Sequence, residues 1–169
     1  MTTDPARLFL ALWPGPAARG ALVDARDAWV WPAGARPVAE AKLHLTLHFV
    51  GAVERERVPA LDAALRVVPC APFELRLARA ALWPPGIAVL QPRAAPPRLL
   101  ALHAALGAAL RRLELPVDTR PYRPHVTLAR HAVGAAPPGD TPALHWRVRG
   151  HALVESRGGA YVVLGRYGC

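Results

Sequence analysis

Cysteine is scarce in this chain: Cys70 and Cys169 are the only two among 169 residues. They lie far apart, form no CxxC pair, and have no cluster of further metal-ligand residues beside them. Disulfide scaffolds and structural zinc sites use closely and regularly spaced cysteines. The sequence therefore predicts neither a disulfide scaffold nor a zinc site, and it fits a reducing compartment.

Long apolar runs are also missing. Leu8–Trp13 follows Arg7 as in a signal peptide, but Pro14 ends the run after about six residues, below the usual 7–15. No segment approaches the roughly 18 apolar residues of a membrane span. We therefore expect a soluble, cytoplasmic protein that does not contact a membrane.

Acidic residues are few, and Lys42 is the only lysine. The 21 basic residues outnumber the 12 acidic ones, which gives a formal net charge of +9 and a pI near 11.1. Such a surface attracts phosphate-bearing partners and speeds their arrival. A solvated basic surface without a specific partner gives the same charge, so composition alone leaves both interpretations open.

Apolar residues are abundant, at 53% of the chain, with a mean hydropathy of +0.17. This composition excludes a disordered chain, and 169 residues suffice for one domain with a core of its own.

The two halves of the chain repeat the same order of elements around His44 and His125, which lie at equivalent places. Each half reads as a strand, a helix, a Pro-bearing loop, a strand with the histidine, and an alternating strand. The expected strands are 7–13, 43–50, 73–82, 86–90, 125–128, 144–153 and 160–164, and the expected helices are 17–28, 54–65 and 98–113.

This repeat predicts an α+β fold. Two pseudo-twofold-related lobes, each an antiparallel β-sheet with one or two helices, should flank a central cleft. The repeat boundary falls near residues 84–86, but the first strand of one half can pair within the other lobe. Residues 1–169 are therefore expected to form a single bilobal domain.

The strand sequences LHLTLHFV and PHVTLAR each place a histidine and a threonine on one face. His44 and Thr46 alternate with core leucines, as do His125 and Thr127 with Val126 and Leu128. Two such pairs across a twofold cleft can place an acid and a base on opposite sides of one phosphorus atom, because imidazole exchanges protons near neutral pH. A single H-x-T strand is usually an unremarkable surface, whereas two equivalent copies indicate phosphoryl chemistry with a bell-shaped pH profile around neutrality.

Metal chemistry fits these residues less well. His44 and His48 share a face in a regular strand but lie about 13 Å apart along it, too far for one ion. The sequence contains no Walker loop, no GxGxxG opening a helix and no GxSxG elbow. We expect no cofactor and no metal. His48 is expected at the rim of the cleft. His103 lies in an apolar helix and is expected to have a structural role. The histidines expected at the surface are His131, His145 and His151.

The paired H-x-T-x motifs resemble those of the 2H phosphoesterase superfamily, and the chain is most similar to its RNA 2′,3′-cyclic phosphodiesterases (LigT/ThpR-like, formerly 2′-5′ RNA ligases). The resemblance spans RLFLAL, LHLTLHFVG, PHVTLAR and the closing L-x-x-S followed by YVVL. It implies metal-free hydrolysis of a 2′,3′-cyclic phosphate on RNA or a nucleotide to a 2′-phosphomonoester. His44 and His125 would be the acid–base pair, Thr46 and Thr127 would bind nonbridging oxygens, and Arg130 would contact the phosphate.

The sequence leaves several points open. Strict alternation turns Arg130 away from His125 unless the strand bends or bulges at Ala129. The family usually has an aromatic or basic residue before the first motif, so Arg36 and Lys42 are possible substrate contacts. The candidates for base stacking are Phe9, Trp31 and Tyr122.

The resemblance leaves three functions to compare. The first is hydrolysis at RNA ends, and the second is action of the same site on a cyclic phosphate of ADP-ribose or on 2′-5′ oligonucleotides. A non-catalytic RNA-binding module is the third possibility, although such a module need not keep both histidines and both threonines. The expected partners are RNA ends or nucleotides with a 2′,3′-cyclic phosphate, and the expected state is a monomer.

Overall fold

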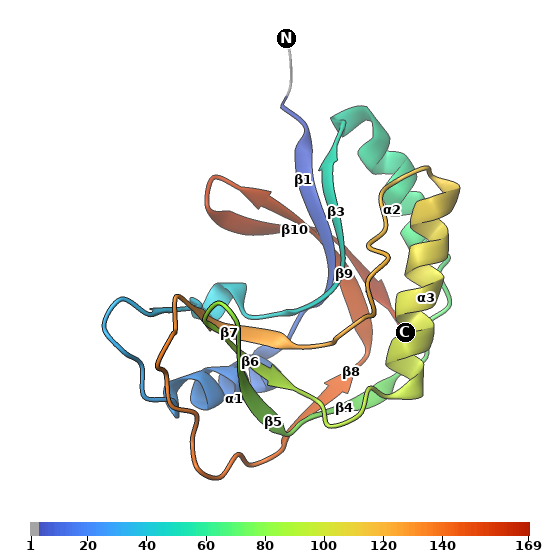
Figure 1. Ribbon diagram of the computed structural model, residues 1–169. Coiled ribbons are helices and arrows are strands. Elements are labelled where there is room, and N and C mark those ends of the chain that lie inside the picture. Colours follow the sequence, from blue (N-terminus) through green and yellow to red (C-terminus); the bar gives the residue numbers. More distant parts are fainter. Residues whose placement is uncertain (1–3) are drawn as a thin grey trace.

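A computed structural model describes residues 4–169 and shows two groups of strands with helices along their outer sides (Figure 1). The elements, in chain order, are β1 (Ala6–Leu12), α1 (Pro16–Asp27), β2 (Arg36–Pro37), η1 (Glu40–Lys42), β3 (Leu45–Val53), η2 (Arg55–Arg57), α2 (Val58–Arg66), β4 (Phe73–Leu77), β5 (Arg79–Trp83), β6 (Ile87–Gln91), α3 (Pro97–Arg112), β7 (Val126–Arg130), β8 (Leu144–Val148), β9 (Gly150–Arg157) and β10 (Ala160–Gly168). The predicted α+β class with antiparallel sheets is confirmed.

The main sheet has the strand order β10-β9-β1-β3-β7-β6-β5, and β2 pairs with β7. Its two lobes meet at a single residue pair, where Leu45 of β3 lies opposite Val126 of β7 in antiparallel register. Each of these residues directly follows a motif histidine. Because equivalent residues of the two repeats face each other there, a local twofold axis passes between them, and the two motifs begin side by side.

The lobes exchange strands between the two halves of the sequence. The first lobe contains β10, β9, β1 and β3, and the second lobe contains β7, β6, β5 and the short β2. The C-terminal hairpin β9–β10 thus joins the N-terminal strand β1. Each lobe of the main sheet therefore contains strands from both halves of the sequence.

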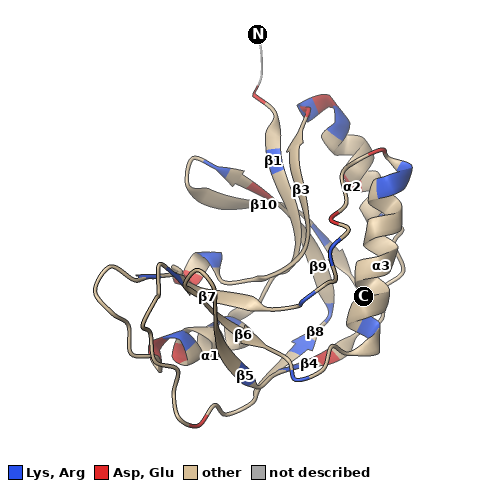
Figure 2. Ribbon diagram, viewed as in Figure 1, with Lys and Arg blue, Asp and Glu red and all other residues tan. Residues whose placement is uncertain are grey.

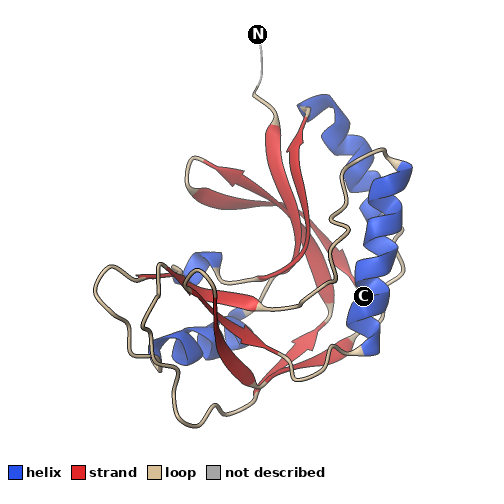
Figure 3. Cartoon of the chain, viewed as in Figure 1, coloured by secondary structure: helices blue, strands red, loops and turns tan. Residues whose placement is uncertain are grey.

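Helices α2 and α3 lie side by side along the outside of the first lobe, and α1 lies beside the second (Figures 1 and 3). Leu99, Leu102, Leu106 and Leu110 recur at helical spacing in α3 and are buried against the core. Both α1 and α3 begin at a proline, whose fixed φ and missing N–H suit the first helical position.

Two strands expected to be continuous are divided. Segments 73–82 and 144–153 break after five residues, at Ala78 and Arg149, so that β4 pairs with β8 in a separate small sheet. Ala78 already donates its N–H to the carbonyl of Gln91 in the main sheet, at 3.1 Å. Each segment therefore passes from one sheet to another, which an unbroken polar–apolar alternation does not reveal.

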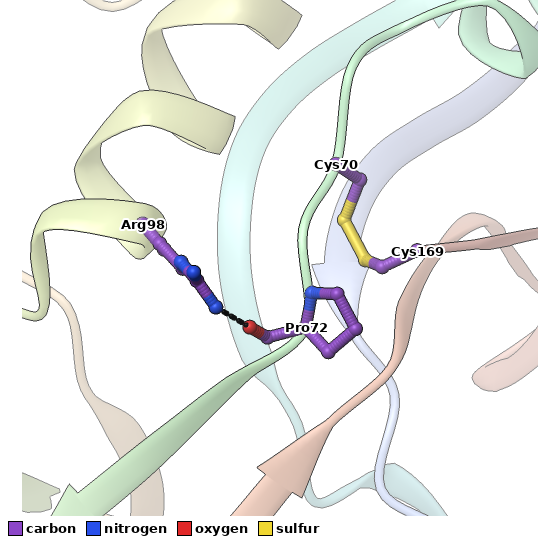
Figure 4. The surroundings of a disulfide bond; sticks show 4 residues. All are labelled: Cys70, Pro72, Arg98 and Cys169. Carbon is purple, nitrogen blue, oxygen red and sulfur yellow. Dashed lines mark hydrogen bonds between the residues drawn. A yellow bond between two sulfur atoms is a disulfide. The ribbon is translucent and has the colours of Figure 1, made fainter.

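The two cysteines are linked by a disulfide, which corrects the expectation from their spacing (Figure 4). Cys169 ends the chain after β10, and Cys70 lies in the connection between α2 and β4. The Cα atoms are 4.6 Å apart, which falls within the range of disulfides. Arg98 of α3 donates to the carbonyl of Pro72 at 2.6 Å in the same connection. Tertiary folding brings together two residues separated by 99 positions.

Within residues 4–169, no helix combines the length and the apolar character that crossing a membrane requires. Lysine and arginine positions are distributed over elements of both lobes rather than confined to one (Figure 2).

Candidate active site

A cleft of about 1020 Å³ lies between the lobes and contains both sequence motifs. Its lining includes all five site residues expected from the sequence: His44, Thr46, His125, Thr127 and Arg130. Arg7 and Lys42 also line it. No carboxylate is found among the described residues that line the cleft. The walls thus favour an anion, and two imidazoles are within reach of it.

The two imidazoles are held in the same way. His44 Nδ1 lies 2.6 Å from the carbonyl of Lys42, and His125 Nδ1 lies 2.7 Å from the carbonyl of Arg123. In each case the acceptor is the residue two positions before the histidine. A carbonyl can only accept, so Nδ1 carries the proton and Nε2 is left for proton exchange.

The Nε2 atoms differ in their partners. His44 Nε2 is 2.9 Å from Thr46 Oγ1, so the threonine hydroxyl donates to the neutral ring. His125 Nε2 makes no hydrogen bond to any of the residues 4–169. The site is therefore chemically asymmetric, although its backbone is nearly twofold.

Burial lowers the pKa of both His44 and His125 below the ordinary value of 6.5, and the hydrogen bonds to the carbonyls oppose this effect. Positive neighbours lower both pKa values further: Arg19 acts on His44, Arg123 acts on His125, and Arg130 acts on both. The charged form of His125 also lowers the pKa of His44. Each ring is thus favoured in its neutral form before an anion binds.

A β-bulge explains why Arg130 faces the cleft. Thr127 lies opposite Val89 and Ala129 lies opposite Ala88, so the register skips Leu128. The extra residue reverses the alternation, and Arg130 returns to the side of Thr127. The bend that the sequence required is present next to Ala129.

The first motif strand contains the same irregularity, and there it overturns an expectation. Thr46 lies opposite Ala11 and His48 lies opposite Leu10, so the register skips Leu47. His48 is consequently not at the rim of the cleft but buried behind β3, with 4% of its surface exposed. Phe49 takes the place on the cleft side and is 66% exposed.

Phe49 is a cleft residue that sequence reasoning missed. It follows His44 by five positions, as Arg130 follows His125, and both are turned into the cleft by bulges three residues after their histidines. The repeat itself contained the signal: once a bulge is required for Arg130, the equivalent residue of the first motif faces the cleft too.

Of the three candidates for base stacking, Phe9, Trp31 and Tyr122, only Phe9 lines the cleft. Tyr122 stacks on His103, with ring centroids 3.8 Å apart, and donates its hydroxyl to the Thr46 carbonyl at 3.0 Å, so it supports β3 from behind. Phe9 lines the cleft but is only 5% exposed, packed against the His44 ring at 4.9 Å. Trp31 stacks on Trp29 at 5.1 Å and does not line the cleft.

Among the remaining histidines, His131 and His145 are exposed as expected. His151 is instead buried, and it packs beside Tyr167 in the first lobe. Within residues 4–169, no three His, Cys, Asp or Glu side chains gather as a metal site would require.

Comparison with known proteins places these features in a family. Residues 21–160 match the 2′-5′ RNA ligase superfamily. The RNA 2′,3′-cyclic phosphodiesterase of Escherichia coli (strain K12) is 34% identical over 141 residues, covering 81% of this chain and 80% of that protein. The protein of the same name from Thermus thermophilus is 34% identical over 181 residues, covering 95% of this chain and 89% of that protein.

Solved structures agree with the sequence relatives. The crystal structure of E. coli LigT in its apo form matches with a TM-score of 0.84 at 29% identity, covering 98% of each chain. Further crystal structures of that protein contain phosphate or 3′-AMP. By sequence, fold and the placement of its paired histidine motifs, the chain belongs to the 2′-5′ RNA ligase superfamily of two-histidine phosphoesterases.

Proposed function

We propose that this protein hydrolyses the 2′,3′-cyclic phosphate of an RNA end or nucleotide to a 2′-phosphomonoester, without a metal ion. One observation carries the proposal: two H-x-T strands meet at a local twofold axis and present two imidazoles to one cationic cleft. Relatives of 34% identity that bear the name RNA 2′,3′-cyclic phosphodiesterase support the choice of substrate.

The reaction assigns complementary tasks to the two histidines. His125 Nε2 accepts a proton from water as the water oxygen attacks phosphorus, and the bond between phosphorus and the 3′-oxygen breaks. The imidazolium of His44 donates its Nε2 proton to that departing oxygen. Each ring changes protonation state once, so the next turnover needs a proton to return from His125 to His44 through solvent. The free Nε2 of His125 supports its role as the base.

The other cleft residues bind the substrate. The Thr46 and Thr127 hydroxyls donate to nonbridging oxygens, and the Arg130 guanidinium neutralises the charge that develops on the phosphoryl group. The exposed ring of Phe49 gives the nucleobase an aromatic face at the opposite motif. The two residues at equivalent positions thus divide the substrate between them: Arg130 takes the phosphate and Phe49 takes the base.

The decisive experiment is hydrolysis of 2′,3′-cyclic AMP and of cyclic-phosphate-ended RNA in EDTA, with the phosphomonoester identified by chromatography. His44→Ala and His125→Ala are each expected to reduce the rate by at least about 100-fold. His145→Ala, which removes an exposed histidine outside the cleft, is the matched control. Activity that is abolished by EDTA, or retained in either cleft variant, would refute the mechanism.

A second substrate class uses the same site. The family description, 2′-5′ RNA ligase, favours a 2′-5′ phosphodiester as an alternative to the cyclic phosphate. Assaying a 2′-5′ dinucleotide and a cyclic phosphate of ADP-ribose beside the two main substrates ranks these candidates by kcat/KM.

Two further expectations belong to this proposal. A substrate at RNA ends favours a cytoplasmic location, whereas the Cys70–Cys169 disulfide is unusual in a compartment that keeps thiols reduced. The complete cleft within one chain requires no second subunit, so a monomer is the expected active form.

A further inference from the structure

Each cleft histidine contacts a tryptophan, and that tryptophan contacts an arginine. Trp13 stacks on His44, with centroids 5.7 Å apart and planes 23° apart, and the Arg19 guanidinium carbon lies 5.3 Å from the Trp13 ring centre. Trp83 lies 4.5 Å from the His125 ring, and the Arg123 guanidinium carbon lies 4.0 Å from its ring centre. Both indoles are half-buried.

The two His–Trp–Arg triplets are built from unrelated elements. Trp13 follows β1 and Arg19 lies in α1, whereas Trp83 ends β5 and Arg123 precedes β7. The backbone repeat therefore does not impose their similarity. The same order of imidazole, indole and guanidinium around both cleft histidines points to a shared task.

We propose that Trp13–Arg19 and Trp83–Arg123 are positioning pairs for catalysis: each indole fixes one imidazole and holds a guanidinium near it, so that the neutral ring is favoured. The inference rests on the proposed function, because the pairs can position catalytic groups only if the two histidines are catalytic. The contacts themselves do not depend on that function. Cation–π attraction keeps an arginine at an aromatic ring. The indole in turn covers the imidazole and limits its rotation.

The charged surroundings of the two rings support this assignment. His44 faces Arg19 from α1, His125, and Arg130 from β7. It also packs against Tyr161, whose ring is in turn covered by the Lys42 ammonium at 5.2 Å. His125 faces Arg123 and Arg130. No carboxylate among residues 4–169 pairs with either imidazole. Arg19 and Arg123 are the largest charge effects that lower the pKa of His44 and of His125, respectively.

The substrate makes these cations useful. A bound phosphate anion stabilises imidazolium and so raises the pKa of both rings. A base that is already protonated cannot accept a proton from water, and an acid with a strongly raised pKa releases its proton poorly. The two arginines oppose the charge of the substrate and keep both rings able to exchange protons near neutral pH.

The test combines imidazole NMR titrations with pH profiles of kcat/KM on 2′,3′-cyclic AMP. Arg123→Gln should raise the pKa of His125 and move the acidic limb to higher pH, with about threefold lower kcat/KM near pH 5.5 and little change on the plateau. Arg123→Lys should restore most of the wild-type profile. Arg19→Gln should raise the pKa of His44 and extend the alkaline limb.

The tryptophans and controls complete the design. Trp13→Leu, which changes no residue that lines the cleft, should lower kcat about tenfold with little effect on KM, and Trp13→Phe should recover much of that loss. Arg112→Gln removes an exposed charge at the end of α3 and should leave the pKa values of His44 and His125 unchanged. Circular dichroism melts identify variants that fail to fold.

The outcomes separate the two proposals. If neither histidine titration moves in Arg123→Gln and Arg19→Gln, or if Arg112→Gln moves them equally, the positioning pairs are wrong. If wild-type protein lacks cyclic phosphodiesterase activity, the proposed function fails, and the NMR titrations still decide whether the arginines act on the rings.

Discussion

At the residue scale, the two motifs are alike where they hold the histidine and different where they meet a substrate. The carbonyl acceptor lies two residues before each histidine, and the threonine lies two residues after it. Five residues after it, one copy has Phe49 and the other has Arg130. A symmetric site would bind a symmetric ligand. This difference places an aromatic ring at one motif and a guanidinium at the other, which suits an asymmetric ligand such as a nucleotide.

The lowered pKa values of the two histidines predict an acidic pH optimum. The sequence alone suggests limbs on either side of neutrality, but burial lowers the pKa of both His125 and His44. His125 can act as a base only above its pKa, where it is neutral, and His44 can act as an acid only below its pKa, where it is protonated. Because both pKa values are lowered, kcat/KM should peak below pH 7. The limbs of kcat should lie at higher pH, because the bound phosphate anion favours imidazolium.

Initial rates on 2′,3′-cyclic AMP between about pH 4 and pH 9 check this prediction. A kcat/KM plateau that continues to the alkaline end of that range would contradict it.

His151 predicts a stabilising substitution away from the cleft. Its Nδ1 and Nε2 are buried and have no hydrogen-bond partner among residues 4–169, and burial lowers its pKa to about 4. Because the pKa of His151 in the folded protein lies below the ordinary 6.5, the unfolded state takes up a proton more readily than the folded state. The free energy of unfolding is therefore unaffected by protonation of this group above about pH 6.5 and falls as the pH drops toward about 4. His151→Phe should raise the free energy of unfolding by roughly 1 kcal/mol at pH 7, and by more at pH 5.

Urea denaturation at both pH values measures the effect, with His145→Gln as the exposed control. An equal or lower stability of His151→Phe at pH 5 would show that the histidine has a partner in solution.

At the element scale, the strands and helices follow from local pattern, and the irregularities do not. Leucines at helical spacing predict α3, and alternation predicts β3 and β7 close to their observed bounds. The bulges at Leu47 and Leu128 leave no distinctive residue in the sequence, because both are ordinary buried leucines. Only the requirement that Arg130 face the cleft pointed to one of them. His48 was misplaced because strict alternation was assumed for the other.

Two glycines give opposite predictions for their elements. Gly20 lies exposed inside α1, and a Cβ added there would meet only open space, so Gly20→Ala should stabilise the protein by about 0.5–1 kcal/mol. Gly150 begins β9, where a Cβ would collide with the carbonyl oxygen of Tyr167 in β10. Gly150→Ala should therefore cost roughly 1–3 kcal/mol. Thermal melts of the two variants test both signs, and a tolerated Gly150→Ala would mean that β9 and β10 separate easily.

At the scale of the whole molecule, the site depends on how the halves are exchanged. The C-terminal hairpin completes the sheet beside β1, and Tyr161 of that hairpin packs edge-on to His44, with centroids 5.5 Å apart. A residue near the end of the chain thus shapes a site whose first histidine is at position 44. Sequence repeats predicted the two lobes, but the neighbours of Cys70, Trp13 and Trp83 depend on tertiary packing between segments distant in the chain.

The disulfide predicts how the whole molecule responds to reduction. It ties Cys169 at the end of the chain to Cys70 across a separation of 99 residues, so it restricts the unfolded chain strongly. Reduction should lower the free energy of unfolding by roughly 2–4 kcal/mol. Neither cysteine lines the cleft, so hydrolysis of 2′,3′-cyclic AMP at about 25 °C should continue at about the same rate.

Denaturation with and without dithiothreitol measures the difference, and alkylation followed by mass spectrometry counts the free thiols. Cys169→Ser and Cys70→Ser should each match the reduced wild type and should not respond to dithiothreitol, which separates loss of the bond from other effects of the reductant. Equal stability of the oxidised and reduced wild type would mean that the sheet closure between β9, β10 and β1 holds the chain end by itself. A marked change in turnover on reduction would instead show that the C-terminal hairpin transmits the constraint at Cys169 to Tyr161 and so to His44.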